Sequence, residues 1–235
     1  ILAGTPTLER MLELSASTGE MSEYLKQHFD TRLQRSAPES PDDVMDELVR
    51  GVREGLISQQ DAVSIIIVLV GAAGESTSSL VGSAVRILAQ DASLQRRLRE
   101  QPQLIERYVE EVVRLESPFR GHYRAVLKET KLNGVVIPAS ARIFLLWAAA
   151  NRDPAVFCEP DTLDIERHNT NEHLGFGHGI HFCIGARLAR LEARVILEEL
   201  LQQTSSFSLD SAFPVRHVSS IFVRRLDALQ LKLNP

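Results

Sequence analysis

The sequence predicts a mainly α-helical fold with a minor β portion, in one domain spanning residues 1–235. Three observations support this. Apolar residues recur at helical spacing between capping residues as far as Pro118. Short β-branched runs separated by turn residues follow, and a long polar stretch then precedes one more helical segment. A chain of 235 residues is long enough to bury a sizeable core.

Residues 1–118 are expected to be mainly helical. Capping residues, acidic first turns and a Ser/Pro-rich break at Ser36–Pro41 delimit the helices. The expected helices are one within residues 1–35, one from Pro41 to about Glu54, a long one over about 58–90 capped by Ser58, one over 94–100 capped by Ser93, and one over 104–116.

Residues 119–150 are expected to form the small β portion, followed by an irregular segment over 151–185 and by a helix and terminal strands over 186–235. Turn signals at Asn133-Gly134 and Pro138-Ala139 separate the apolar runs of the β portion. The expected strands are 125–127, 135–137, 143–146, 219–223 and 229–233, and the last helix is expected over about 184–203.

The composition excludes some classes of protein. The 26 basic and 31 acidic residues leave a net charge of −5, which argues against nucleic-acid binding because that needs a basic surface. Two cysteines, Cys158 and Cys183, do not make a disulfide-stapled secreted scaffold, so a cytoplasmic location is expected. The most apolar run, Ile65–Ala73, is shorter than the ~20 residues needed to cross a bilayer, so no membrane segment is expected.

The segment Phe176–Gly185 carries the strongest chemical signal. Its glycines allow a sharp bend and a close approach to a flat group. Cys183 lies just before a predicted helix, whose N-terminus would stabilise a thiolate. A thiolate ligand pushes electron density onto haem iron and favours O–O cleavage. The pattern therefore predicts a haem-thiolate site.

Three other interpretations stay open on these residues alone. Gly175, Gly177 and Gly179 hint at a dinucleotide-binding loop, but the spacing is not G-x-G-x-x-G. His178, His181 and Cys183 could suggest zinc, although no fourth ligand follows at normal spacing. A lone cysteine at a helix start can also be a small buried apolar residue.

The order Phe176-x-x-Gly179-x-x-x-Cys183-x-Gly185, continued by Leu188-Ala189-Arg190-x-Glu192, resembles the haem-binding signature of the cytochrome P450 family. The resemblance implies the P450 fold and haem b (iron protoporphyrin IX) as cofactor. It makes Cys183 the axial ligand of the iron and places Phe176 beside the sulfur. His181 would bond a haem propionate, and Gly177, Gly179 and Gly185 would shape the loop against the haem. A loop-capping role is the alternative for His181.

Glu111 and Arg114 lie three residues apart on a predicted helix and share one face. An exposed ion pair of little energetic weight is one interpretation. The resemblance implies another, in which Arg167 joins them in a buried structural network. It also makes Arg124 a haem propionate partner, since a guanidinium suits a carboxylate; the alternative for Arg124 is a surface arginine at a strand edge.

The segment Gly71–Thr77 places poor helix formers in the middle of the long helix, which is typical of a kink or of close helix packing. The resemblance places this segment over the distal face of the haem, with Ala72 against the cofactor. It makes Glu75 the acid and Ser76 the alcohol of a proton relay, with Thr77 able to share the role. Ser76 departs from the family's usual threonine, and an alternative register makes Thr77 the alcohol.

The resemblance also implies a substrate pocket of mixed polarity. Its candidate residues are Val68, Ala72, Phe119 to Tyr123 (Phe119, Arg120, Gly121, His122 and Tyr123), Ile221 and Phe222. Arg120 and His122 could meet a polar group of a small organic substrate, and Phe222 suggests an apolar body. The substrate itself does not follow from the sequence.

The expected activity is O2-dependent monooxygenation, with electrons from a ferredoxin and an NAD(P)H-dependent ferredoxin reductase. Arg187, Arg190 and Arg194 share a helix face and could dock an acidic redox partner, or form a solvated face. The alternatives are an H2O2-driven peroxygenase and a haem-binding fragment without turnover in isolation. The match begins near Pro41 and the chain begins at Ile1, so a piece lacking the family's N-terminal part is expected.

Overall fold

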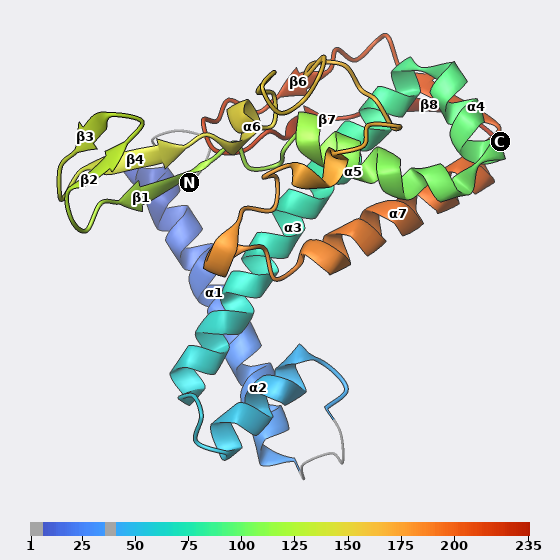
Figure 1. Ribbon diagram of the computed structural model, residues 1–235. Helices are drawn as coiled ribbons and strands as arrows, with labels where there is room; N and C mark the ends of the chain where they lie inside the picture. Colours follow the sequence, from blue (N-terminus) through green and yellow to red (C-terminus); the bar gives the residue numbers. More distant parts are fainter. Residues whose placement is uncertain (1–6, 36–40) are drawn as a thin grey trace. The chain divides into compact units, whose positions relative to one another are not determined.

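The computed structural model describes residues 7–35 and 41–235 and is mainly helical (Figure 1). The chain divides into two compact units, and the division falls within one helix, between Gly74 and Glu75. Each unit has a hydrophobic core of its own. The single domain expected over 1–235 stays a prediction.

The first unit contains α1 (Leu8–Gln34), α2 (Val44–Arg53) and the start of α3 (Gln59–Gln90). Its core consists of Leu25, Phe29, Val49, Ala62 and Ile66. The Ser58 hydroxyl accepts the Asp61 N–H at 3.1 Å, so the expected cap of the long helix is present. The expected helix bounds agree with the structure to within a few residues, and all of the break predicted at Ser36–Pro41 except Pro41 lies outside the described residues.

The second unit contains the rest of α3, α4 (Ala92–Glu100), η1 (Pro102–Leu104), α5 (Ile105–Leu115) and α7 (Ala186–Gln203). The helices α5 and α7 pack against each other (Figure 1). The prediction that Ser93 caps α4 is wrong. Asp91 is the cap, because its carboxylate accepts the N–H groups of Ser93 and Leu94, both at 2.9 Å.

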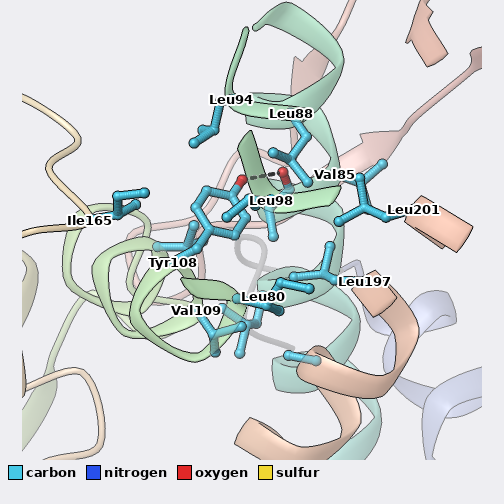
Figure 2. Packing of buried hydrophobic residues seen from close by; sticks show 14 of the residues in the cluster. Leu80, Val85, Leu88, Leu94, Leu98, Tyr108, Val109, Ile165, Leu197 and Leu201 are labelled. Atoms are coloured by element: carbon cyan, nitrogen blue, oxygen red, sulfur yellow. Dashed lines mark hydrogen bonds between the residues drawn. The ribbon is translucent and has the colours of Figure 1, made fainter. Parts of the chain in front are cut away.

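The core of the second unit surrounds Tyr108 on α5 (Figure 2). The Tyr108 side chain is fully buried, and its hydroxyl donates to the Ala84 carbonyl of α3 at 2.6 Å. Burial raises the pKa of Tyr108 well above its ordinary value. Apolar side chains from α3, α4, α5 and α7 pack around the ring, among them Leu80, Leu88, Leu98, Val109 and Leu197. This core fixes the positions of α5 and α7, which hold the candidate site.

The strands of the described residues form four antiparallel pairs. The pairs are β1 (His122–Ala125) with β4 (Arg142–Leu145), β2 (Thr130–Leu132) with β3 (Val135–Ile137), β5 (Ser206–Leu209) with β8 (Leu231–Asn234), and β6 (Arg216–His217) with β7 (Leu226–Ala228). The first predicted strand starts three residues too late. The strand predicted over 219–223 is wrong, because this segment has only one bridge, between Phe119 and Val223.

The irregular segment expected after residue 150 is present and carries only short helical turns. These are η2 (Thr170–Glu172) and η3 (Gly179–His181), and α6 (Trp147–Ala150) precedes the segment. α7 starts at Ala186, two residues later than expected, with Gly185 at its N-cap.

The helix α3 is long and apolar enough to cross a membrane by length and composition alone. The core helix of a soluble protein passes the same test, so this finding is weak evidence for a membrane segment.

Candidate functional site

The loop Phe176–Gly185 presents Cys183 at the surface, three residues before α7. Gly177 and Gly179 have φ angles of +74° and +69°, in the left-handed region that a side chain disfavours. The Cys183 N–H donates to the Phe176 carbonyl at 2.9 Å, and the Cys183 carbonyl accepts the Ala186 N–H at 3.2 Å. The two glycines and two hydrogen bonds therefore fold the loop back so that the thiol stands free of the core.

The side chains around Cys183 are apolar and open to solvent. Ile180 is 98% exposed, Ile184 is 90% exposed and Phe182 is 52% exposed. An exposed apolar patch beside a cysteine suits the face of a flat apolar group, and Cys183 supplies a soft ligand for a metal at its centre. The residues present therefore fit haem. In the described part of the chain, His, Cys, Asp and Glu side chains form no cluster that could hold a metal by themselves, so the zinc interpretation gains no support.

A buried network of charges lies on α5. Arg114 donates to Glu111 through Nε at 2.8 Å and through Nη2 at 2.7 Å, and both side chains are fully buried. Arg167 donates to the same carboxylate at 3.2 Å and is 7% exposed. The structure thus brings the three predicted network residues together, and the interpretation of Glu111 and Arg114 as an exposed pair does not hold.

The network ties the irregular segment to α5. Arg114 also donates to the carbonyls of Asn151 (2.8 Å), Pro160 (2.7 Å) and Thr162 (3.1 Å), so every N–H of its guanidinium has an acceptor. Arg167 donates to the Cys158 carbonyl at 2.6 Å. Because breaking one member of a buried charge network costs roughly 3–5 kcal/mol, this segment is firmly held.

Two residues that the sequence analysis did not single out hold the backbone just before the cysteine loop. The Asn151 side chain donates to the Ser117 hydroxyl at 2.9 Å and accepts the Leu174 N–H at 2.6 Å. His173 Nδ1 accepts the Gly175 N–H at 3.1 Å. Their positions follow from contacts between distant segments, and no local pattern in the sequence marks them.

The candidate distal residues lie in the middle of α3. Val68 and Ala72 belong to the first unit and are exposed there. Glu75, Ser76 and Thr77 belong to the second unit and are half-buried. These latter three share one stretch of helix, which brings an acid and two hydroxyl groups within one turn of one another.

An ion pair holds the candidate acid of the distal segment. The Glu75 carboxylate lies 3.4 Å from Arg225 Nε, and the two side chains are 35% and 38% exposed. Arg225 was not a candidate residue, and its spacing in the sequence gives no sign of this pairing.

The aromatic candidates of the substrate pocket gather around β1 and β4. His122 packs edge-on against Phe119 (5.4 Å between ring centroids) and stacks on Trp147 (4.9 Å). Tyr123 and Phe222 approach to 5.7 Å. The Arg120 N–H donates to the Phe222 carbonyl at 2.6 Å, and Ile221 is 59% exposed. The sequence analysis did not single out Trp147. Its ring lies close to the cysteine loop, because a Cβ placed on Gly177 would be 3.8 Å from it.

Arg124, the predicted propionate partner, is half-buried on β1. Its Nη1 donates to the Tyr123 carbonyl at 2.9 Å, and within residues 7–35 and 41–235 it makes no ion pair with a carboxylate. His181 is exposed in η3. The geometry leaves both side chains able to meet an anionic group.

The comparisons with known proteins decide the family. The family model described as cytochrome P450 matches residues 5–212, which is most of the chain. The chain belongs to the cytochrome P450 family. A P450 of Mycobacterium tuberculosis, cytochrome P450 144, is 39% identical over 231 residues, covering 98% of this chain and 52% of that protein. The biotin biosynthesis cytochrome P450 of Bacillus subtilis is 37% identical over 77% of this chain and 46% of its own.

The solved structures agree with this assignment. The crystal structure of P450BioI in complex with an acyl carrier protein that carries hexadec-9Z-enoic acid superposes with a TM-score of 0.87 at 33% identity. The match covers 98% of this chain and 58% of that one. The fold is therefore part of the P450 fold, and the chain spans about half the length of the curated relatives that it matches.

Proposed function

We propose that this P450 chain carries the thiolate-ligand half of a haem-dependent monooxygenase, with haem b bound through Cys183. One observation carries the proposal: an exposed cysteine stands in a loop of left-handed glycines and exposed apolar side chains, ahead of a helix N-terminus. The bound haem would supply reductive activation of O2, so that one oxygen atom enters the substrate and the other leaves as water.

The residues of this chain would bind and orient the cofactor. Cys183 would hold the iron as a thiolate, stabilised by the backbone N–H groups at the start of α7. Ile180, Phe182 and Ile184 would cover the face of the ring and exclude water from the sulfur, since all three are exposed and apolar. Arg124 and His181 would bind the propionates, because neither side chain pairs with a carboxylate in the described residues.

Proton delivery would use the acid and hydroxyl groups of α3. Glu75 would take up protons at its carboxylate, and Ser76 or Thr77 would hand them toward the distal side through ordered water. Monooxygenation needs two protons and two electrons for each substrate, which gives such a relay a purpose that a peroxide-driven reaction lacks. Phe119, Arg120, His122, Ile221 and Phe222 would line the pocket of a small organic substrate, and the roles of Val68 and Ala72 stay predictions.

Electrons would come from a ferredoxin and an NAD(P)H-dependent reductase in the cytoplasm. The three arginines of α7 differ as docking candidates. Arg190 pairs with Glu110 and Arg194 pairs with Glu106, whereas Arg187 is exposed and forms no ion pair in the described part of the chain. An acidic partner would therefore depend most on Arg187, and Arg187→Glu should slow electron transfer most at low salt.

The test loads the chain with haem and offers hexadec-9Z-enoic acid, the acyl group of the P450BioI complex, as a probe. Reductase, ferredoxin, NADPH and labelled O2 are supplied in one reaction and H2O2 in another. A product with one labelled oxygen, formed only with the electron-transfer proteins, is expected. Product formed only with peroxide would favour a peroxygenase, and haem binding without either product would favour a binding fragment.

A further inference from the structure

A second charged cluster, separate from the network of Glu111, lies between α5, α7 and the start of the cysteine loop. Glu110 is the residue beside Glu111, but its side chain meets Arg190 of α7 and His173 near the end of the irregular segment. Arg190 Nη2 donates to Glu110 Oε2 at 2.9 Å, and His173 Nε2 lies 3.2 Å from the same oxygen. The exposed fractions of the Glu110, Arg190 and His173 side chains are 19%, 34% and 2%.

The hydrogen bonds of His173 assign its protons. Its Nδ1 accepts the Gly175 N–H at 3.1 Å, so Nδ1 carries no proton. The proton of the neutral ring is then on Nε2, which donates to Glu110. Glu110 accepts hydrogen bonds from both residues, which favours its ionised form. Burial opposes that ionisation, but hydrogen bonds from Arg190 and His173 outweigh it and lower the pKa of Glu110 to about 2.

The cluster reaches the cysteine loop through Phe176. The Arg190 guanidinium lies over the Phe176 ring at 4.3 Å from its centroid, and the His173 ring is 5.7 Å from the same ring. The Phe176 carbonyl in turn accepts the Cys183 N–H at 2.9 Å. A guanidinium stacked on an aromatic ring and fixed by a carboxylate holds that ring in one orientation.

We infer that Glu110, His173 and Arg190 form a positioning unit that fixes Phe176 and, through its carbonyl, the backbone of Cys183. These residues do not touch the reacting atoms, so their role is to position the ligand. The contacts that hold Phe176 all lie within the chain, and only the consequence for the iron ligand rests on the proposed function. The unit also gives Arg190 a role distinct from the docking of a redox partner.

The same helix supplies a matched control. Arg194 lies one turn further along α7 and pairs with Glu106 of α5 at 2.6 Å, as Arg190 pairs with Glu110. Its pair is more exposed, at 37% and 68%, and it contacts no residue of the cysteine loop in the described structure. Arg194→Gln therefore removes a similar ion pair from the same interface without touching Phe176.

The experiment measures amide hydrogen exchange of Cys183 and Gly175 in the haem-free chain. Arg190→Gln, Glu110→Gln and His173→Gln should each speed exchange at Cys183 by about tenfold or more relative to Arg194→Gln. Arg190→Lys keeps the charge but loses the planar fork, so it should behave as Arg190→Gln does. The amide of Val112 in α5 should exchange as in the wild type, which separates local loosening from global unfolding.

Equal exchange at Cys183 in all variants, an effect of the same size in Arg194→Gln, or wild-type behaviour of Arg190→Lys would each overturn the inference. A second measurement follows the haem-loaded chain in its reduced, CO-bound form. The fraction of thiolate-type spectrum should fall in the three variants and not in Arg194→Gln. Altered exchange with no thiolate spectrum even in the wild type would leave the positioning unit standing and contradict the proposed function.

Discussion

The buried network on α5 and the cysteine loop differ in how their functional groups are satisfied. The network buries its charges and pairs them within the chain, whereas the loop exposes its thiol and its apolar side chains. In the network, Glu111 and Arg114 are fully buried and every N–H of the Arg114 guanidinium has an acceptor within the chain. In the loop, Ile180 and Ile184 are 98% and 90% exposed, and the Cys183 thiol faces solvent.

The comparison shows which of the two regions is satisfied by contacts within the chain. The network has no polar group left over, so it contributes to folding whether or not a cofactor is bound. The loop leaves apolar surface exposed beside a potential metal ligand, and this is the surface that the proposed haem would cover. Substitutions in the two regions should therefore separate loss of folding from loss of haem ligation.

The largest effect is expected from breaking the network with Arg114→Met. The substitution leaves the Glu111 carboxylate buried with Arg167 as its remaining charged partner. The free energy of unfolding should fall by roughly 3–5 kcal/mol, measured by urea denaturation and circular dichroism. The control is Arg97→Met, because Arg97 pairs with Glu166 at an exposed site (40% and 65%) and should cost less than about 1 kcal/mol. Equal losses of unfolding free energy in Arg114→Met and Arg97→Met would show that the buried network is no more stabilising than an exposed ion pair.

The next largest effect is a pH dependence of stability that comes from Glu110, the α5 residue that pairs with Arg190 and His173. The pKa of Glu110 falls from 4.5 to about 2 on folding, so its ionised form stabilises the fold above pH 4.5 by up to about 3 kcal/mol. This contribution is lost as pH falls from 4.5 toward 2. The charged groups that line the cleft around it are Glu106, Arg107, Arg187, Arg190 and Arg194, and His173 faces it from just before the cysteine loop.

Glu110→Gln should accordingly be less stable than the wild type at neutral pH, and the gap should close in acid. Urea denaturation of both proteins at several pH values between 7 and about 2 measures the gap. A gap that stays constant over this range would show that the carboxylate's charge is not what stabilises the fold.

A smaller effect is expected from Tyr108→Phe in the core. The substitution removes the 2.6 Å hydrogen bond from the hydroxyl to the Ala84 carbonyl and keeps the ring (Figure 2). The free energy of unfolding should fall by about 1 kcal/mol, which ranks a neutral buried bond below the charged network. Tyr123 is 50% exposed, so Tyr123→Phe should change stability by less than about 0.5 kcal/mol. A larger loss in Tyr123→Phe than in Tyr108→Phe would reverse this ranking.

The parts of the fold that depend on local signals could be predicted from the sequence. The bounds of α3 follow from Ser58 and from the apolar spacing, and the motif around Cys183 marks the loop. The pairing of β5 with β8 could not be predicted, because β5 is only four residues long and its partner lies far along the chain. Asp91 was missed as a cap since Ser93, its own hydrogen-bond partner, has the same capping preference.

The site was predictable to the same degree. Glu111 and Arg114 could be placed together by helical spacing, and Arg167 by family resemblance. Asn151, His173 and Trp147 were not foreseen, because they act through contacts between segments that local sequence does not relate. The partners of Glu110 and Glu75, namely Arg190 and Arg225, escaped notice for the same reason.

The most direct test of the central claim is the absorption spectrum of the haem-loaded, reduced and CO-bound chain, recorded for the wild type, Cys183→Ser and Cys158→Ser. Cys158 is also exposed and lies outside the loop, so it is a matched control. The account predicts a far-red Soret band typical of thiolate ligation in the wild type and in Cys158→Ser, and its loss in Cys183→Ser. A thiolate-type band that survives in Cys183→Ser, or is lost in Cys158→Ser, would contradict the assignment of Cys183 as the haem ligand.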